Sequence, residues 1–409
     1  MFKKHIPQVE FVALMASLMA TVALAIDALL PALDIIGFSV GSVSVADNQQ
    51  IIIMIFLGLG IGPLVFGPIS DSIGRKPVVY MGFFLFILSS FMCVFAQNLT
   101  VLIIGRVLQG IALSAPRTIS IAIIRDTYSG DHMARVMSFV TVVFLLVPVI
   151  APALGKLILD AYNWQAIFYV QIVFAMLVGI WFWKRQPETL REENTVKFSA
   201  HIFTDGLREL LKYKQTMGYT FISGFIVGSF LVYLSTAQQV FQEQYGLKEE
   251  FPYIFAGLAI SIGAATFLNG SFVLKFGMKK LITVFLISFF LISLSYVILF
   301  FGKSNPSIEI LLLFLAAQFF SISFLFGNLR SAAMQPIGHI AGIGAAITGF
   351  ISTLMSVPIS TYIGSFVDDS VLPLFLGFFV CAFLSLLILV YLKVAEKKKI
   401  ATPGLSAKS

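Results

Sequence analysis

The stretch GPISDSIGRKP, residues 67–77, decides the fold of this chain. It places an acid and two adjacent basic residues between two long apolar runs. Gly74 permits a tight turn, and Gly67 permits two helices to approach closely. Asp71 is able to interact favourably with a helix N-terminus, and the basic residues with carboxylates and lipid phosphates. A short charged turn of this kind predicts the loop between two membrane-spanning helices.

The composition around this turn is typical of an integral membrane protein. The 409 residues are 58% hydrophobic and only 11% charged, with a mean hydropathy of +0.96, whereas soluble proteins carry about 25% charged residues. A helical span needs about 20 apolar residues, and no strand-like alternation occurs between the apolar runs. We therefore expect an all-α membrane protein with twelve spans, near residues 9–32, 49–70, 77–96, 100–124, 133–158, 164–184, 216–240, 250–274, 281–301, 308–329, 340–366 and 371–392.

The first apolar run has a second interpretation. Lys3 and Lys4 precede it and Ala-Leu-Ala stands at 23–25, which resembles a cleaved signal peptide. Eleven further spans follow, so we treat the run as the first helix.

An internal repeat divides the chain into halves. GSFVLKFGMKKLIT, from Gly270, repeats the seven-residue glycine spacing and the basic residues of the first turn, with Leu274 at the place of Asp71. The longest polar stretch lies between the halves, and part of it has helical apolar spacing that suits the membrane surface or a solvated linker. Duplicated six-helix halves with a site between them indicate a transporter. The expected domains are a bundle at 1–184, a linker at 185–215, a bundle at 216–393 and a tail at 394–409.

The basic residues predict the orientation. With a cytoplasmic N-terminus, all but five of the 27 Lys and Arg lie in cytoplasmic segments. The exceptions are Lys156, Lys248 and Lys303 outside, and Arg106 and Arg117 within the fourth span. Both termini are then cytoplasmic. This orientation and contact of the basic residues with anionic lipids explain the net charge of +7. We therefore expect no nucleic acid as a partner.

The 67–77 turn resembles the loop signature G-x-x-x-D-x-x-G-R-[KR] of the major facilitator superfamily. That resemblance implies twelve helices in two pseudo-symmetric six-helix bundles. In the superfamily the aspartate engages the start of helix 11, and the basic residues pair with an acid after helix 4, for which IIRD at 123–126 has the matching place. The implied conformational latch comprises Gly67, Asp71, Gly74, Arg75, Lys76, Arg125 and Asp126.

Two further motifs resemble those of proton-coupled members. GRVLQG at 105–110 is similar to R-x-x-Q-G of helix 4. VPVIAPALG at 147–155 resembles the helix-5 antiporter motif through Pro148, Pro152 and Gly155, although Val147 and Lys156 replace two of its glycines. The A-P-x-x-G form after a proline is that of the bicyclomycin-resistance (Bcr/CflA) subfamily of drug:proton antiporters. Proline and small residues also give a bendable helix, or a kink without function.

Asp27, within ATVALAIDALLPALDII (20–36), is the only acid well inside a predicted span. A charge there is costly and usually marks function, unless the residue merely ends a helix at the interface. Arg106 is expected at a similar depth, which makes it the favoured partner. Burial disfavours the charged form of Asp27 and a nearby Arg106 favours it, so alternating exposure would cycle its protonation. We therefore predict that Asp27 and Arg106 couple transport to protons.

Other polar residues within the spans are candidates to contact substrate, with interhelical hydrogen bonding as the alternative. Arg117 either lines the cavity or extends to the inner interface. These candidates are Gln109, Arg117, Tyr233, Gln238, Asn269 and Gln318.

The expected function is export of a lipophilic, neutral or singly cationic small molecule in exchange for protons, by a monomer in the bacterial cytoplasmic membrane. Export of one native metabolite or siderophore, and proton-coupled nutrient uptake, remain alternatives. No enzyme motif occurs, so we do not expect an enzyme. We also expect no cofactor and no metal, because the only two cysteines, Cys93 and Cys381, lie in different halves as core residues.

Overall fold

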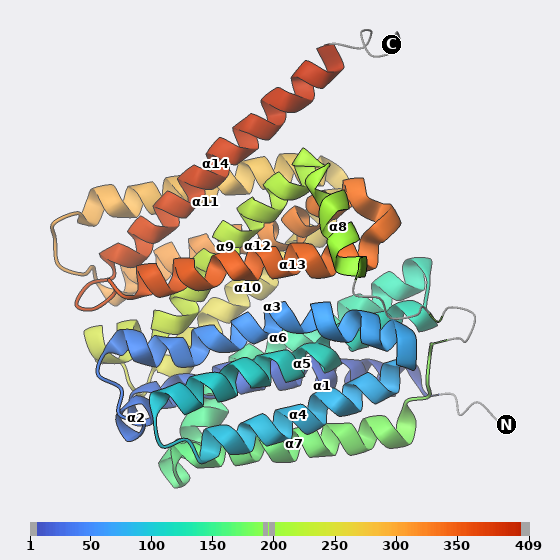
Figure 1. The fold of residues 1–409 in the computed structure, drawn as a ribbon. Coiled ribbons are helices and arrows are strands. Elements are labelled where there is room, and N and C mark those ends of the chain that lie inside the picture. The colour runs from blue at the N-terminus through green and yellow to red at the C-terminus, as the bar shows by residue number, and fades with distance from the viewer. Residues whose placement is uncertain (1–5, 191–194, 196–200, 402–409) are drawn as a thin grey trace.

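The computed structural model describes residues 6–190, 195 and 201–401, and throughout them the regular structure is helical (Figure 1). Eleven helical segments of the described residues are long and apolar enough to cross a membrane. A further helix of 32 residues, α6, stands where the fifth span is expected. The predicted all-α membrane fold is therefore confirmed. The α-helices are α1 (Gln8–Asp27), α2 (Leu33–Ser39), α3 (Val45–Ile73), α4 (Arg75–Val94), α5 (Leu99–Thr127), α6 (Gly130–Ala161), α7 (Trp164–Arg185), α8 (His201–Leu211), α9 (Lys214–Gln238), α10 (Phe251–Phe276), α11 (Met278–Phe300), α12 (Ile308–Met334), α13 (Ala341–Gly364) and α14 (Leu372–Ala401).

The helices form two groups that lie side by side (Figure 1). In the first group α3 and α4 both pack on α5, and α1 packs on α6. In the second group α9 packs on α13, and α11 on α12 and α14. The two groups meet where α3 contacts α13 and α6 contacts α10. We call them the N half and the C half.

The first expected span is interrupted after Asp27 and continues to Ser39. Helix α1 stops at Asp27, and the short 3₁₀ turn η1 (Leu30–Ala32) leads into α2. Pro31 explains the break, because proline has no N–H to donate to the carbonyl oxygen of Asp27, four residues earlier. Asp27 therefore lies at the C-terminal end of a helix and not in its middle.

Helix α8 belongs to the polar stretch between the halves. Its Leu210 is fully buried and packs with Ile337 and Ile347, so α8 is held against the C half. Its expected position on the membrane surface remains a prediction.

The two ends of the bundle carry different polar contacts. Helices α3 and α4 are joined at one end, which we call the Arg75 end, and α2 joins α3 at the opposite end, the Asp34 end. Helix α1 begins and α14 ends on the side of the Arg75 end (Figure 1).

Candidate functional site

Arg106 is fully buried on α5 and connects three helices of the N half. Its Nε donates to the carbonyl oxygen of Ile51 on α3 at 2.8 Å, and its Nη2 to that of Ala25 on α1 at 3.1 Å. Its Nη1 donates to Oε1 of Gln109 at 2.7 Å, and Gln109 in turn donates to Ser90 Oγ on α4 at 2.7 Å. Arg106 therefore stabilises the last turn of α1, whose carbonyl groups lack helical partners.

The expected ion pair between Asp27 and Arg106 is absent from this structure. Asp27 is 5% exposed, and within the described chain no hydrogen bond or ion pair reaches its carboxylate. The guanidinium faces backbone and amide oxygens instead, because the C-terminal end of α1 offers carbonyl groups closer to it than the Asp27 side chain. The prediction of a direct partnership was wrong for this conformation.

The group that does interact with Asp27 comes from the C half. The Asp27 carboxylate acts electrostatically on the hydroxyl of Tyr233, which is buried on α9. That hydroxyl has no hydrogen-bond partner among the described residues. The Tyr233 ring is fixed by an edge contact with Phe319 at 4.4 Å between centroids and by stacking on Phe255 at 6.3 Å. An acid of one half and a free hydroxyl of the other thus lie near each other.

Helix α6 packs closely behind Asp27. A Cβ atom added at Gly155 would lie 1.9 Å from the carbonyl oxygen of Ala28, so only glycine permits this approach. The antiporter-like motif therefore packs against the residue next to Asp27. Pro148 and Pro152 lie inside the same helix.

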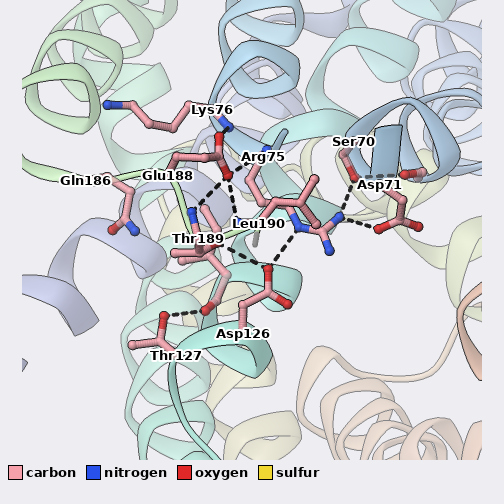
Figure 2. A network of polar contacts seen from close by, with 12 residues as sticks. Ser70, Asp71, Arg75, Lys76, Asp126, Thr127, Gln186, Glu188, Thr189 and Leu190 are labelled. Atoms are coloured by element: carbon pink, nitrogen blue, oxygen red, sulfur yellow. Dashed lines mark hydrogen bonds and ion pairs between the residues drawn. The ribbon is translucent and has the colours of Figure 1, made fainter. Parts of the chain in front are cut away.

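The 67–77 turn forms a network around Arg75, a nearly buried residue (Figure 2). Its Nε donates to Asp126 Oδ2 at 2.9 Å, and its Nη1 donates to Ser70 Oγ at 2.8 Å and to Asp71. The network joins the end of α3, the start of α4 and the end of α5. Gly74, at φ 107°, makes the turn between α3 and α4.

Glu188 completes this network, and sequence reasoning missed it (Figure 2). Its carboxylate accepts from the backbone N–H of Arg75 at 3.0 Å and of Lys76 at 2.9 Å, which caps the start of α4. It also accepts from the N–H groups of Thr189 and Leu190 at 2.8 and 2.9 Å. Burial raises the pKa of Glu188, but these four donors outweigh it and hold the pKa below 4.5. The signal was PETL at 187–190, an acid just after α7 at the same end of the bundle.

Several expected roles in this network need correction. The space around Gly67 is open, so it does not serve close helix packing in this conformation. Lys76 donates to the carbonyl oxygen of Trp183 at 3.4 Å and not to an acid. Arg125 is exposed, and the described chain offers it no ion pair. Asp71 contacts Arg75 of its own half and not the start of α13, because this conformation keeps the carboxylate within reach of the guanidinium.

Four of the six substrate candidates make hydrogen bonds between helices. Gln109 is held by Arg106 and Ser90, as described above. Gln318 donates to Ser293 Oγ at 2.5 Å, Asn269 accepts from Asn328 at 2.7 Å, and Gln238 donates to Asp34. Tyr233 keeps its free hydroxyl. Arg117 is half-buried and lies within electrostatic range of Arg330 on α12, a like charge.

The Asp34 end carries polar contacts between the halves. Gln49 Nε2 donates to Gln239 Oε1 at 3.1 Å and to the carbonyl oxygen of Gly364 at 3.0 Å. Lys156, the residue that departs from the antiporter motif, forms a 3.1 Å ion pair with Glu249 of the C half. A glycine at position 156, as in the antiporter motif, would lack this ion pair between the halves. The halves are therefore joined at the Asp34 end.

The fold and these contacts define a class of protein: a carrier with many membrane-spanning helices in two packed halves. The chain belongs to the Major Facilitator Superfamily, whose family model matches residues 11–359. It is 30% identical over 315 residues to the uncharacterized MFS-type transporter YdgK of Bacillus subtilis, and this match covers 75% of the present chain and 77% of YdgK. It is 26% identical over 346 residues to the bicyclomycin resistance protein homolog of Haemophilus influenzae, with 81% and 83% covered.

Solved structures share the fold. The partially occluded, inward-open xylose transporter XylE from E. coli superimposes with a TM-score of 0.70 at 14% identity, over 94% of this chain and 96% of that one. Its membership of the Major Facilitator Superfamily makes the chain a transporter of small molecules and not an enzyme.

Proposed function

We propose that this transporter exports lipophilic small molecules in exchange for protons, by alternating access, with Asp27 as the proton carrier. The observation that carries the proposal is the position of Asp27: it is buried, has no counter-ion among the described residues, and lies within electrostatic range of Tyr233 of the other half. An isolated buried carboxylate is far more costly ionised than protonated. The C-terminal end of α1 adds a further unfavourable negative potential. Asp27 therefore carries a proton in this conformation.

Release of that proton requires a different environment. When the halves move apart around α1 and α9, water reaches Asp27 and the cost of ionisation falls. Arg106 then acts as a positioning residue, because it holds Ala25 and so the turn that carries Asp27. The free Tyr233 hydroxyl is suited to accept or donate a hydrogen bond to a substrate that competes for this space.

The substrate class follows from the interior charges. Arg117 lies within electrostatic range of Arg330, no acid of the described chain neutralises either of them, and positive charge there repels a dication. We therefore propose neutral or singly cationic lipophilic substrates. The relative with bicyclomycin resistance in its name supports a drug-like substrate.

The orientation and location are part of the same proposal. Basic residues gather toward the Arg75 end, so we place that end, together with both termini, in the bacterial cytoplasm. The transporter then works as a monomer in the cytoplasmic membrane.

The test is Asp27→Asn in proteoliposomes with an imposed pH gradient. Asparagine keeps the size and hydrogen-bonding shape of the side chain but does not titrate. We expect loss of transport driven by the gradient and of substrate-induced proton movement, while substrate binding remains. Asp160→Asn, an exposed acid at the Asp34 end, is the matched control. Full gradient-driven transport by Asp27→Asn would exclude Asp27 as the carrier.

A further inference from the structure

Two acids of different halves meet at the Asp34 end of the bundle. Asp34 lies in α2 of the N half, and Glu243 lies in the π-helical turn η3 (Gln239–Gln244) of the C half. Their carboxyl groups are in hydrogen-bonding contact. Neither residue is explained by the proton carrier Asp27 or by the network around Arg75.

Amide groups surround this pair and contact Asp34 from both halves. Asn48 Nδ2 donates to Asp34 Oδ1 at 3.2 Å, and Gln238 Nε2 donates to Asp34 Oδ2. The Gln238 side chain also contacts Glu243. Amide donors thus occupy both Asp34 oxygens, and a hydrogen bond between the two carboxyl groups themselves needs a proton on one of them.

The lysines around the pair do not neutralise both carboxylates. Lys248 attracts Glu243 from the loop before α10. Lys156 lies on α6 in the same pocket of about 230 Å³ as Asp34, but it is engaged by Asp160 and Glu249 at 3.1 Å each. Among the described residues Lys248 is thus the one nearby lysine without an ion pair, and like charges in contact favour one shared proton over two ionised carboxylates.

The pair is open to water. Asp34 is partly exposed and Glu243 is exposed, and both lie on the side opposite the Arg75 network. A proton held there exchanges directly with the solution at the Asp34 end, without passing through the interior where Asp27 lies.

We propose that Asp34 and Glu243 form a second proton-binding site, in which one shared proton joins the two halves at the Asp34 end. This inference rests on the alternating access of the proposed function. When the halves separate at this end, the two carboxyl groups part, both ionise, and the proton leaves to water. When they close, one proton is taken from the solution and the contact forms again.

The sign of the pH effect follows from this proton count. The state closed at the Asp34 end binds one proton more than the open state, so acid favours closure and alkali favours opening. With one linked proton, the ratio of open to closed protein changes by at most about tenfold per pH unit. The site therefore ties closure to protonation on the side from which protons enter.

The experiment measures closure directly in the full-length protein in liposomes. Spin labels are placed on cysteines at Val43 and Phe301, which are 93% and 71% exposed on different halves at this end. Both native cysteines are buried. The distance distribution between the labels is recorded from about pH 5 to about pH 8.5, a range that begins just above the ordinary carboxyl pKa of about 4. We expect a closed population at acidic pH that gives way to an open one as the pH rises.

Glu243→Gln is the decisive variant. A glutamine amide donates to Asp34 without any titratable proton, so we expect a shallower pH dependence of closure, with only the contribution of the proposed carrier Asp27 left. Glu249→Gln is the matched control: it removes an acid at the same interface, but one that pairs with Lys156. It is expected to open the protein somewhat at every pH while it keeps the wild-type pH slope.

The outcomes separate this inference from the role of Asp27. Labelled Asp27→Asn is expected to keep the pH-dependent distance change even though its transport fails. If Asp27→Asn abolishes the pH dependence, or if Glu243→Gln leaves its slope unchanged, the shared-proton site is excluded. If Asp27→Asn transports normally but Glu243→Gln loses the pH dependence, the proposed carrier fails and the second site stands. Thermal unfolding of each labelled variant verifies that it is folded.

Discussion

Arg75 and Asp126 lie 51 residues apart in the chain and are joined by a 2.9 Å ion pair that fixes the end of α5 against the start of α4. The Asp126 side chain is 18% exposed, whereas that of Asp71, the other acid on Arg75, is 46% exposed. The two acids therefore differ in their shielding from water, and this difference predicts unequal effects of mutation.

Asp126→Asn should destabilise the protein more than Asp71→Asn. A hydrogen bond to a charged group contributes about 1.5–3 kcal/mol when it is shielded, while an exposed ion pair contributes less than about 1 kcal/mol. Thermal unfolding of the purified variants in detergent measures the difference. Charge reversal at Asp126 should also reduce transport in correctly inserted protein. Equal losses for the two Asn variants would contradict this account of the network.

Glu188→Gln should remove an acid-sensitive part of the stability. The folded protein holds the pKa of Glu188 below 4.5 through four backbone donors, so its contribution is present above the ordinary carboxyl pKa and is lost as the pH falls through the lowered value. The variant should unfold at a lower temperature than the wild type near pH 7, and the difference should shrink below about pH 4. Asp205→Asn on α8, an exposed acid, is the control and should cost little at either pH.

Gly155→Ala should displace α6 from the segment that follows Asp27. The added Cβ would lie 1.9 Å from the carbonyl oxygen of Ala28, a backbone atom that has little freedom to move. Overpacking of this kind costs about 1–3 kcal/mol. Gly263→Ala on α10 is the control, because its Cβ would meet nothing within 4 Å. We expect lower thermal stability and slower transport for Gly155→Ala alone, and a neutral result there would disprove the close packing.

Arg106→Lys should be a severe change although it keeps the charge. Lysine cannot reproduce the fork that reaches the carbonyl oxygens of Ile51 and Ala25 together with Gln109. Loss of at least two of these buried bonds should cost about 2 kcal/mol or more. Thermal unfolding and hydrogen exchange at the end of α1 are the measurements. Increased hydrogen exchange at the end of α1 would support Arg106 as a positioning residue. Unchanged exchange would mean that Arg106 acts through its charge alone.

The sequence by itself determined the fold class, because hydrophobic length and charge patterning act locally and need no partner. Twelve apolar runs predicted twelve long helices, and the resemblance of the turn at 67–77 to the superfamily signature implied a pairing with Asp126, which Arg75 forms. Glycine at position 74 predicted the tight turn, since a φ of 107° suits little else.

Only the tertiary structure decided which polar groups meet. The sequence predicted that Arg106 and Asp27 lie at a similar depth in the membrane. Depth does not fix the direction of a side chain around the helix axis, and the Arg106 guanidinium donates to the carbonyl oxygen of Ala25 instead. Glu188 reaches the start of α4 from beyond α7, over a distance in sequence that no periodic pattern records. The contact of Asp34 with Glu243 depends on how the two halves close, and that arrangement is set by packing along their whole shared surface.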